Sequence, residues 1–303
     1  MSEIDLETYN LLFDMACKYE SQLNGYPLVT EKVYAEQKEN EIVGTSDAIV
    51  QMYELMKAFQ QDIEEYYLDT NYKKLGHDNY VNDNPFEGRG VVYTVITGEY
   101  EELKKPLFVD DKLDYICFTN NKSMASDFWE IRFLENEDEL DNVRLARRTK
   151  ILCSEYLDDY DYSIYIDGSF EIIGDIHKLI DFNSKGRGML VFAHNMCDGI
   201  GEELDLCISL GKDIPELMKA QVWKYLEDGY DMRLGMIASG CIIRKHHDEK
   251  LDETMKYWWS QVRNESKRDQ LSFCYSCWKN EYEFDVCNRL AIDNEYIKLH
   301  EHK

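Results

Sequence analysis

Runs of apolar, aromatic and β-branched residues in the middle of the chain predict β-strands. The five clearest runs are Val91–Ile96, Tyr115–Thr119, Trp129–Phe133, Tyr162–Ile166 and Met189–Ala193. Near-continuous runs of this kind are typical of strands that are buried on both faces of a parallel sheet.

Segments with helical spacing separate and follow these strands. The predicted helices cover Asn142–Tyr156, Gly201–Leu210, Ile214–Asp228 and Leu251–Asn264, and a further β-type segment covers Met236–Arg244. Strands that alternate with helices favour an α/β fold. We therefore predict a mainly parallel sheet that is flanked by helices.

Residues 1–88 follow a different pattern. Leu6–Tyr19 predicts one helix, and a longer amphipathic helix is predicted after the N-cap candidate Ser46. The apolar face of this longer helix consists of Ile49, Met52, Tyr53, Met56, Phe59, Ile63 and Tyr66. The polar stretch Asn79–Gly90 is typical of a linker. We therefore expect a helical N-terminal appendage at 1–88 and a second domain at 89–303. The appendage either packs on that domain or mediates homo-oligomer formation or the docking of a partner helix.

The negative charge of the chain argues against anionic binding partners. The formal net charge is −26, from 60 acidic and 34 basic residues. A surface of this sign repels nucleic acids and anionic lipids, so we expect neither as a partner. An anionic ligand would have to be bound by a local basic cluster.

The cysteines and the hydropathy pattern bear on location. The chain has nine cysteines, of which only Cys274 and Cys277 form a CxxC pair, and packing explains that pair better than a metal or redox site does. We find no pattern of a signal peptide and no apolar run of transmembrane length. We therefore expect a soluble protein in the reducing cytoplasm.

The first candidate for chemistry is Asp167, which directly follows the Tyr162–Ile166 strand and precedes Gly168. In an open α/β sheet, ligands bind beyond the carboxyl ends of the strands. Glycine at the next position lets the backbone turn tightly or approach a ligand closely. The alternative is a strand that simply ends in an Asp-Gly turn.

A basic cluster lies in the predicted helix that leads into this strand. Its members are Arg144, Arg147, Arg148 and Lys150. Arginine makes bidentate contacts to phosphate oxygens, so the cluster is a candidate diphosphate site. The alternative is a set of exposed ion pairs with Asp158, Asp159 and Asp161, each of which would contribute little stability.

Two further segments carry polar groups that could contact a ligand. Ser239-Gly240 is a turn of small residues that enters an apolar strand, and Arg268-Asp269-Gln270 precedes an apolar segment. Three adjacent side chains with different hydrogen-bonding patterns suit sugar hydroxyls. They also suit a helix start in which Asp269 is the N-cap and Arg268 is exposed.

Together, these segments resemble the glycosyltransferase-like domain of the plant mucilage and pectin-related proteins and their bacterial homologues. The similar segments are Val91–Pro106, Asp114–Thr119, Lys150–Leu152, Tyr160–Ser169, Ser239–Arg244 and Arg268–Phe273. That family is similar to the GT-A nucleotide-sugar transferases, so the resemblance implies a GT-A-like, Rossmann-like domain. In those enzymes an Asp-x-Asp at a strand end binds a divalent metal and the donor diphosphate. Here the motif is Asp167-Gly168-Ser169, which lacks the second carboxylate.

The resemblance implies a role for each matching residue. The nucleotide would contact Thr94, Thr97 and Tyr100. The diphosphate would contact Arg147 and Lys150, while Asp167 and Ser169 would hold the ribose and either metal or phosphate. The donor sugar would contact Ser239, Gly240, Asp269 and Gln270, and His194, in a segment that includes Glu203, would lie on the acceptor side. Asp167 and Asp269 are the residues that we expect to be catalytic.

The resemblance also implies a cofactor and partners. Manganese or magnesium would be held by Asp167 together with His300 and His302, two histidines near the end of the chain. The donor would be a nucleoside-diphosphate sugar such as a UDP-sugar, and the acceptor a glycan or glycolipid of a membrane-bound assembly system. The remaining alternatives are a hydrolase that acts on a glycan or lipid and a catalytically silent binding protein.

Overall fold

The computed structural model describes residues 63–75, 83–99, 101–287 and 294–300, together with positions 58, 61 and 289. Residues 63–75 are helical. The predicted helix at Leu6–Tyr19 and most of the longer amphipathic helix lie outside the described residues. Tyr100 and His302 lie outside them as well.

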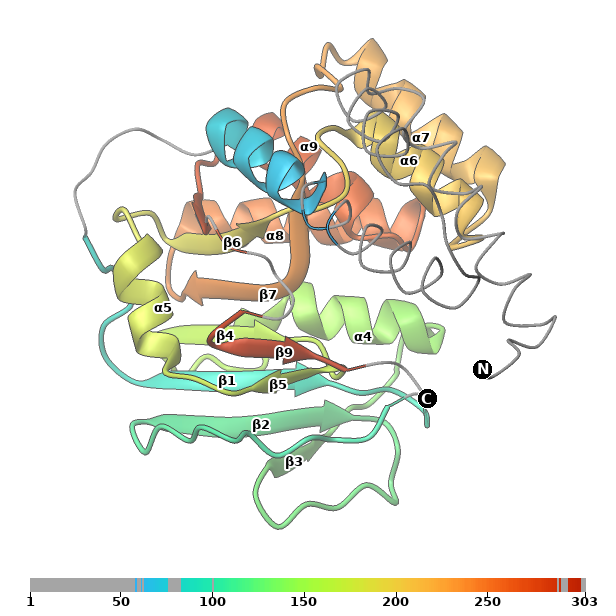
Figure 1. The fold of residues 1–303 in the computed structure, drawn as a ribbon. Helices are drawn as coiled ribbons and strands as arrows, with labels where there is room; N and C mark the ends of the chain where they lie inside the picture. The colour runs from blue at the N-terminus through green and yellow to red at the C-terminus, as the bar shows by residue number, and fades with distance from the viewer. Residues whose placement is uncertain are drawn as a thin grey trace, which may run out of the picture. The chain divides into compact units, whose positions relative to one another are not determined.

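Seven strands form one mixed sheet in the order β3-β2-β1-β4-β7-β6-β8 (Figure 1). Their bounds are β1 (Gly90–Val95), β2 (Leu113–Thr119), β3 (Glu130–Phe133), β4 (Tyr162–Ile166), β6 (Met189–Ala193), β7 (Ile237–Lys245) and β8 (Asp285–Cys287). Neighbouring strands pair in parallel, except that β7 is antiparallel to both β4 and β6. The predicted α/β fold with a mainly parallel sheet is confirmed.

Helices pack on both faces of this sheet (Figure 1). The core on one face contains residues of α4 (Asn142–Ile151), α6 (Ile200–Ser209), α7 (Pro215–Glu227), α8 (Glu249–Asn264) and α9 (Gln270–Lys279). The core on the other face contains residues of α5 (Ile176–Asn183) and of a small antiparallel sheet made of β5 (Phe170–Ile172) and β9 (Ile297–Leu299). None of the helices in the described ranges is both long enough and apolar enough to cross a bilayer.

Several short elements were not predicted from the sequence. They are β5, β8 and β9, with three residues each, and α5, with eight. The helix predicted at Asn142–Tyr156 instead ends at Ile151 and continues as a 3-10 turn at Cys153–Glu155. A run of three residues is too short to establish a period of 2 or 3.6, so pattern alone cannot identify such elements.

The helix at residues 63–75 is joined to the sheet domain by Asn71, whose side chain is completely buried. Its Nδ2 donates to the carbonyl oxygens of His194, at 2.8 Å, and Cys197, at 2.7 Å. Its Oδ1 accepts from the N–H of Met236 at 2.7 Å. The domain boundary at residue 88 stays a prediction, and these three hydrogen bonds connect residues on its two sides.

Candidate functional site

The strand directions bring several predicted site residues to one edge of the sheet. The carboxyl ends of β1, β4 and β6 and the amino end of the antiparallel β7 share this edge. Asp167 follows β4, and its N–H donates to the carbonyl oxygen of Gly240 at 2.8 Å. His194 follows β6, and its N–H donates to the carbonyl oxygen of Met236 at 3.0 Å. The edge is therefore the place where ligands are expected to bind.

A buried ion pair lies at the centre of this edge. Lys150 of α4 and Asp269, at the start of α9, are 0% and 1% exposed. The Nζ of Lys150 lies 2.6 Å from Oδ2 of Asp269 and donates to Oγ of Ser239 at 3.0 Å. Ser239 Oγ in turn donates to the same Asp269 oxygen at 3.0 Å. Three segments that are distant in sequence thus share one polar cluster.

Arg147 extends this cluster to the surface. Its Nε lies 3.2 Å from Oδ1 of Asp269, and its Nη1 lies 3.8 Å from Oδ1 of Asp167. The side chains of Arg147 and Asp167 are 21% and 34% exposed, so a ligand can reach both of them. The hydroxyl of Tyr165 donates a hydrogen bond to Oδ1 of Asp167. Burial, and then the charge of Asp167, raise the pKa of Tyr165 well above its usual range, so this hydroxyl keeps its proton.

The cations fix the protonation state of Asp269. Burial alone would raise the pKa of this carboxyl, but Arg147, Lys150 and Arg268 together lower it well below its usual range. Asp269 is therefore ionised at any physiological pH and is poorly suited to accept a proton. Its oxygens contact Lys150 and Arg147, which suits a carboxylate that positions these cations.

The four basic residues of α4 have two kinds of partner. Arg144 pairs with Asp141 at 2.9 Å and Arg148 pairs with Glu155 at 2.9 Å, both at the surface. Arg147 and Lys150 instead face Asp269. Arg144 and Arg148 thus form ion pairs, though with Asp141 and Glu155 and not with the expected Asp158, Asp159 and Asp161. The interpretation as a cationic site fits Arg147 and Lys150.

The residues expected around the nucleotide and the sugar lie at the same edge. Thr94 is buried in β1, and its Oγ1 has no hydrogen-bond partner among the described residues. Thr97 donates its hydroxyl to the carbonyl oxygen of Asn142 at 2.8 Å, which ties the end of β1 to α4. Gln270 donates its side-chain amide to the carbonyl oxygen of Ile237 at 3.3 Å. Gly240 faces Asp167, because a Cβ at this glycine would lie 3.3 Å from Oδ2 of Asp167 and 2.6 Å from the ring of Phe170.

The expected metal ligands do not come together in the described residues. Ser169 is buried, and its carbonyl oxygen accepts from the N–H of His300 at 2.9 Å. The imidazole Nε2 of His300 lies 2.8 Å from Oε2 of Glu171 and not at Asp167. Within the described ranges, the groups of three or more clustered metal-ligating atoms contain neither Asp167 nor His300.

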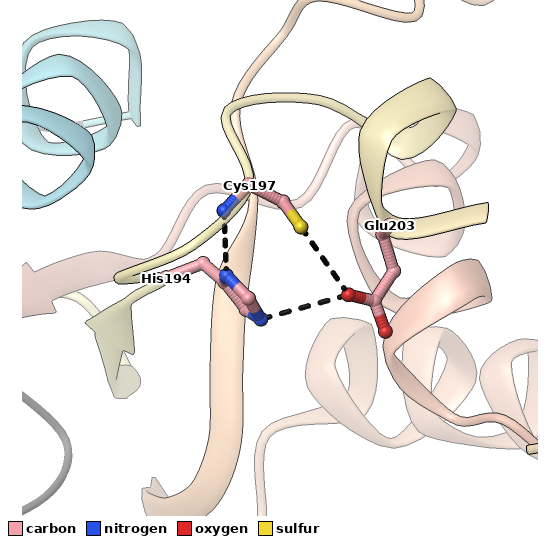
Figure 2. Close-up of side chains that lie close together, drawn as sticks. All are labelled: His194, Cys197 and Glu203. Atoms are coloured by element: carbon pink, nitrogen blue, oxygen red, sulfur yellow. Dashed lines mark hydrogen bonds and ion pairs between the residues drawn. The ribbon is translucent and has the colours of Figure 1, made fainter. Parts of the chain in front are cut away.

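One of these groups consists of His194, Cys197 and Glu203 (Figure 2). Its side chains are buried, with Nε2 of His194 3.6 Å from Oε2 of Glu203 and Sγ of Cys197 3.7 Å from the same oxygen. The other group is Asp110, Asp175 and His177, all half-buried. The first of the two lies beyond β6 and thus next to the site edge.

Sequence reasoning missed Tyr165 and left the position of Arg268 open. Tyr165 lies two positions before Asp167 in an extended segment, so both side chains point to the same side, and this period of two could have indicated their contact. Arg268 was expected either to contact sugar hydroxyls or to be exposed at a helix start. Its side chain is only 21% exposed, and its Nη2 lies 3.4 Å from Oε1 of Glu203.

Comparison with known proteins places the chain in a family. Among curated proteins, none matches this chain. The profile of one family, described as the TOD1/MUCI70 glycosyltransferase-like domain, matches residues 89–302. This range contains all seven strands of the sheet and every described residue of the site edge. The chain therefore belongs to the TOD1/MUCI70 glycosyltransferase-like domain family.

Proposed function

We propose that this protein transfers a sugar from a nucleoside-diphosphate sugar, such as a UDP-sugar, to a glycan or glycolipid acceptor. The observation that carries the proposal is the cationic pair Arg147 and Lys150, held by the buried Asp269 beside Asp167 at the carboxyl edge of the sheet. Membership of a glycosyltransferase-like family supports a transferase.

The chemistry requires a group that stabilises a departing diphosphate. An acceptor oxygen forms a bond to the anomeric carbon, and the bond from that carbon to the diphosphate oxygen breaks with its electron pair. The hydroxyl proton of the acceptor leaves to the diphosphate or to a base. Cations that are already in place stabilise the developing negative charge without having to reorganise. Arg147 is exposed enough to contact phosphate oxygens directly, and its guanidinium suits bidentate contacts.

Asp167 and Asp269 have different roles in this proposal. Asp167 offers a partly exposed carboxylate, oriented by Tyr165 and Arg147, which suits hydrogen bonds from ribose or donor-sugar hydroxyls. Asp269 is buried and ionised, and its negative charge keeps Arg147 and Lys150 close together although these two cations repel each other. Ser239 donates a hydrogen bond to Oδ2 of Asp269.

The described residues do not fit a divalent ion at Asp167. A hard cation such as Mg²⁺ or Mn²⁺ prefers several oxygen ligands. Here Oδ1 of Asp167 already accepts from Tyr165 and faces Arg147, the second carboxylate is replaced by the buried Ser169, and His300 binds Glu171. We therefore assign the leaving-group charge to Arg147 and Lys150 and derive no step through a metal.

The proposal includes a reducing, cytoplasmic location next to a membrane-bound glycan assembly system. It is supported by the cysteines, because the eight in the described part of the chain are all buried and free. A structural disulfide, which oxidising compartments favour, is not formed among them.

Release of free nucleoside diphosphate from a panel of nucleotide sugars tests the function. We expect turnover with at least one UDP-sugar and its loss in Arg147→Ala. A thermal-shift screen with the same nucleotides reports binding, since a ligand at a hundred times its dissociation constant stabilises the fold by about 2.7 kcal/mol. Binding without turnover would indicate a silent member of the family, and a sugar released to water with no acceptor product would indicate a hydrolase.

A further inference from the structure

Glu203 of α6 is a buried carboxylate that four side chains surround. Its side chain is 2% exposed. The contacting atoms are Nε2 of His194 at 3.6 Å, Sγ of Cys197 at 3.7 Å, Sγ of Cys207 at 3.2 Å and Nη2 of Arg268 at 3.4 Å. Figure 2 shows His194 and Cys197 directed at the same carboxylate. A buried carboxylate with this many partners is held in one orientation.

The protonation state of His194 follows from its backbone contacts. Its Nδ1 accepts hydrogen bonds from the N–H groups of Met196, at 3.1 Å, and Cys197, at 3.0 Å. A nitrogen that accepts two hydrogen bonds carries no proton, so the ring proton lies on Nε2 and points to Glu203. Burial lowers the pKa of His194 more than Glu203 raises it, which keeps the ring neutral.

This tautomer argues against a metal at His194, Cys197 and Glu203. A histidine that binds a metal through Nε2 ordinarily carries its proton on Nδ1 and donates it to an acceptor. Here two N–H donors occupy that position. The thiols also keep their protons, because burial and then Glu203 raise the pKa of Cys207 to about 12 and raise that of Cys197 well above its usual range. The cluster is therefore a hydrogen-bond network around Glu203.

The fourth partner, Arg268, links this network to the cationic site. Arg268 directly precedes Asp269, and the charges of both Asp269 and Arg147 act on its guanidinium. Its Nε is buried without a hydrogen-bond partner in the part of the chain that the structure describes. The contact with Glu203 thus leaves guanidinium N–H groups for a further anionic partner, and the partial exposure of the side chain lets such a partner approach.

We propose that Arg268 is a third cation of the donor diphosphate site and that Glu203, oriented by His194, is the positioning residue that holds it there. This inference rests on the proposed function and deepens it. It assigns His194 to the support of Arg268, neither as a base nor as a metal ligand. It also gives two adjacent residues at the start of α9 complementary roles: Arg268 as a cation for the diphosphate, and Asp269 as the carboxylate that holds Arg147 and Lys150.

Inorganic pyrophosphate, titrated by calorimetry, is the probe for this site. Glu203→Asp keeps the charge but shortens the side chain by one methylene, whereas Glu203→Gln keeps the length and removes the charge. If Glu203 positions Arg268, both variants bind pyrophosphate about tenfold more weakly, the factor that corresponds to about 1.4 kcal/mol. If it acts only through its charge, the aspartate variant is unchanged and the glutamine variant binds more tightly, which would overturn the inference.

Two further variants make the measurement specific. Asp205→Asn removes an exposed carboxylate from the same helix and leaves pyrophosphate binding unchanged. In an Arg268→Gln background, Glu203→Asp has no further effect, because the residue that it positions is gone. Additive losses in the double variant would overturn the link between the two residues.

The wild-type protein provides a second readout that does not depend on folding of the variants. In protein labelled with ¹⁵N-histidine, we expect the His194 ring to show the neutral Nε2–H tautomer at pH 7 to 8, because burial lowers the pKa of this ring below its ordinary value of 6.5. An Nδ1–H tautomer, or one zinc per chain in purified protein, would overturn the assignment in favour of a metal site. If wild-type protein binds neither pyrophosphate nor any nucleoside diphosphate, the proposed function fails. The histidine spectrum still shows in that case whether His194 donates its Nε2 proton to Glu203.

Discussion

Lys150 and Asp269 form an ion pair of 2.6 Å in which both side chains are almost completely buried, although 119 positions separate them in sequence. Removing two charges from water carries a large desolvation penalty, which their attraction offsets only when the geometry is good and the remaining hydrogen bonds are made. Ser239 donates one such hydrogen bond to Oδ2 of Asp269, whereas Oδ1 lies 3.2 Å from Nε of Arg147 without a hydrogen-bond partner among the described residues. The role of the pair is better explained as holding the partly exposed Arg147 at the site edge than as a source of stability.

The first prediction concerns the removal of one partner. Asp269→Asn leaves the buried Lys150 without its direct ion-pair partner, so we expect the free energy of unfolding to fall by about 3–5 kcal/mol, the range for a broken buried pair. Chemical denaturation of both proteins measures this loss. Asp205→Asn, an exposed matched change, should be neutral, and an equal loss in both variants would contradict the assignment.

The stability that the ionised Asp269 contributes depends on pH. Because the pKa of Asp269 is lower in the folded protein than its ordinary value of 3.8, its ionised form contributes stability that is complete above about pH 5. This contribution is lost as the pH falls below 3.8 towards the folded-state pKa. The difference in stability between wild type and Asp269→Asn should therefore be constant from pH 7 to 5 and shrink below pH 4. A difference that grows on acidification would show the opposite sign of linkage.

Arg147 and Arg148 offer a matched pair for the donor site. Both lie on α4, but the first faces Asp167 and Asp269 while the second pairs with Glu155 at the surface. We expect Arg147→Ala to weaken nucleoside-diphosphate binding by about 1.5–3 kcal/mol, the range for hydrogen bonds to charged groups. Arg148→Ala should leave the affinity within error. Equal effects in calorimetric titrations would mean that only the overall charge of the helix matters.

The strands and the shared site edge could be predicted from sequence because they depend on short-range pattern. Asp167 follows the carboxyl end of a strand, where ligands are expected in a mainly parallel sheet. Ser239, near the amino end of β7, shares this edge because β7 is antiparallel to β4, which the apolar pattern does not indicate. Val91–Ile96 and Tyr162–Ile166 have apolar runs long enough to be recognised, and the structure places them side by side as β1 and β4.

The contacts within the site could not be predicted in this way. Asp269 does lie at the N-cap position of α9, as spacing indicated, yet its side chain makes no capping hydrogen bond. Its side chain instead contacts Lys150 at 2.6 Å, and its carbonyl oxygen accepts from the indole N–H of Trp258 of α8 at 2.9 Å. Such a choice between a local cap and a distant cation depends on tertiary packing, which periodicity does not encode.

Asp167→Asn tests whether the exposed carboxylate acts on the substrate. The side chain is partly exposed and its backbone N–H, which bonds Gly240, is unaffected by the change. We therefore expect a melting temperature within a few degrees of wild type and a loss of sugar transfer. Tyr165→Phe, which removes only the hydroxyl that orients Asp167, should reduce transfer less. Near-normal turnover in Asp167→Asn would remove this residue from the site.

Asn71 tests whether residues 63–75 support the site. Its side chain satisfies two carbonyl groups, of His194 and Cys197, and one N–H group, of Met236. Because an unsatisfied buried polar group costs about 1–3 kcal/mol, we expect Asn71→Ala to lower the free energy of unfolding by about 3 kcal/mol. Asp69→Asn, on the exposed face of the same helix, is the control. For the same reason, a chain that begins after residue 82 should be less stable than one that begins at residue 63.

The last prediction concerns the metal, which the resemblance to GT-A transferases implies through Asp167, His300 and His302. In the structure the His300 ring contacts Glu171 at 2.8 Å, and its N–H bonds the carbonyl oxygen of Ser169, so this histidine closes β9 onto β5. A partly exposed pair of this kind contributes up to about 1 kcal/mol. We therefore expect His300→Ala to lower the melting temperature slightly while binding of UDP remains the same with manganese and with a chelator. Calorimetric titration of wild type and variant under both conditions measures this. If manganese tightens UDP binding in wild type and not in His300→Ala, the histidine is a metal ligand, and the leaving-group charge does not rest on Arg147 and Lys150 alone.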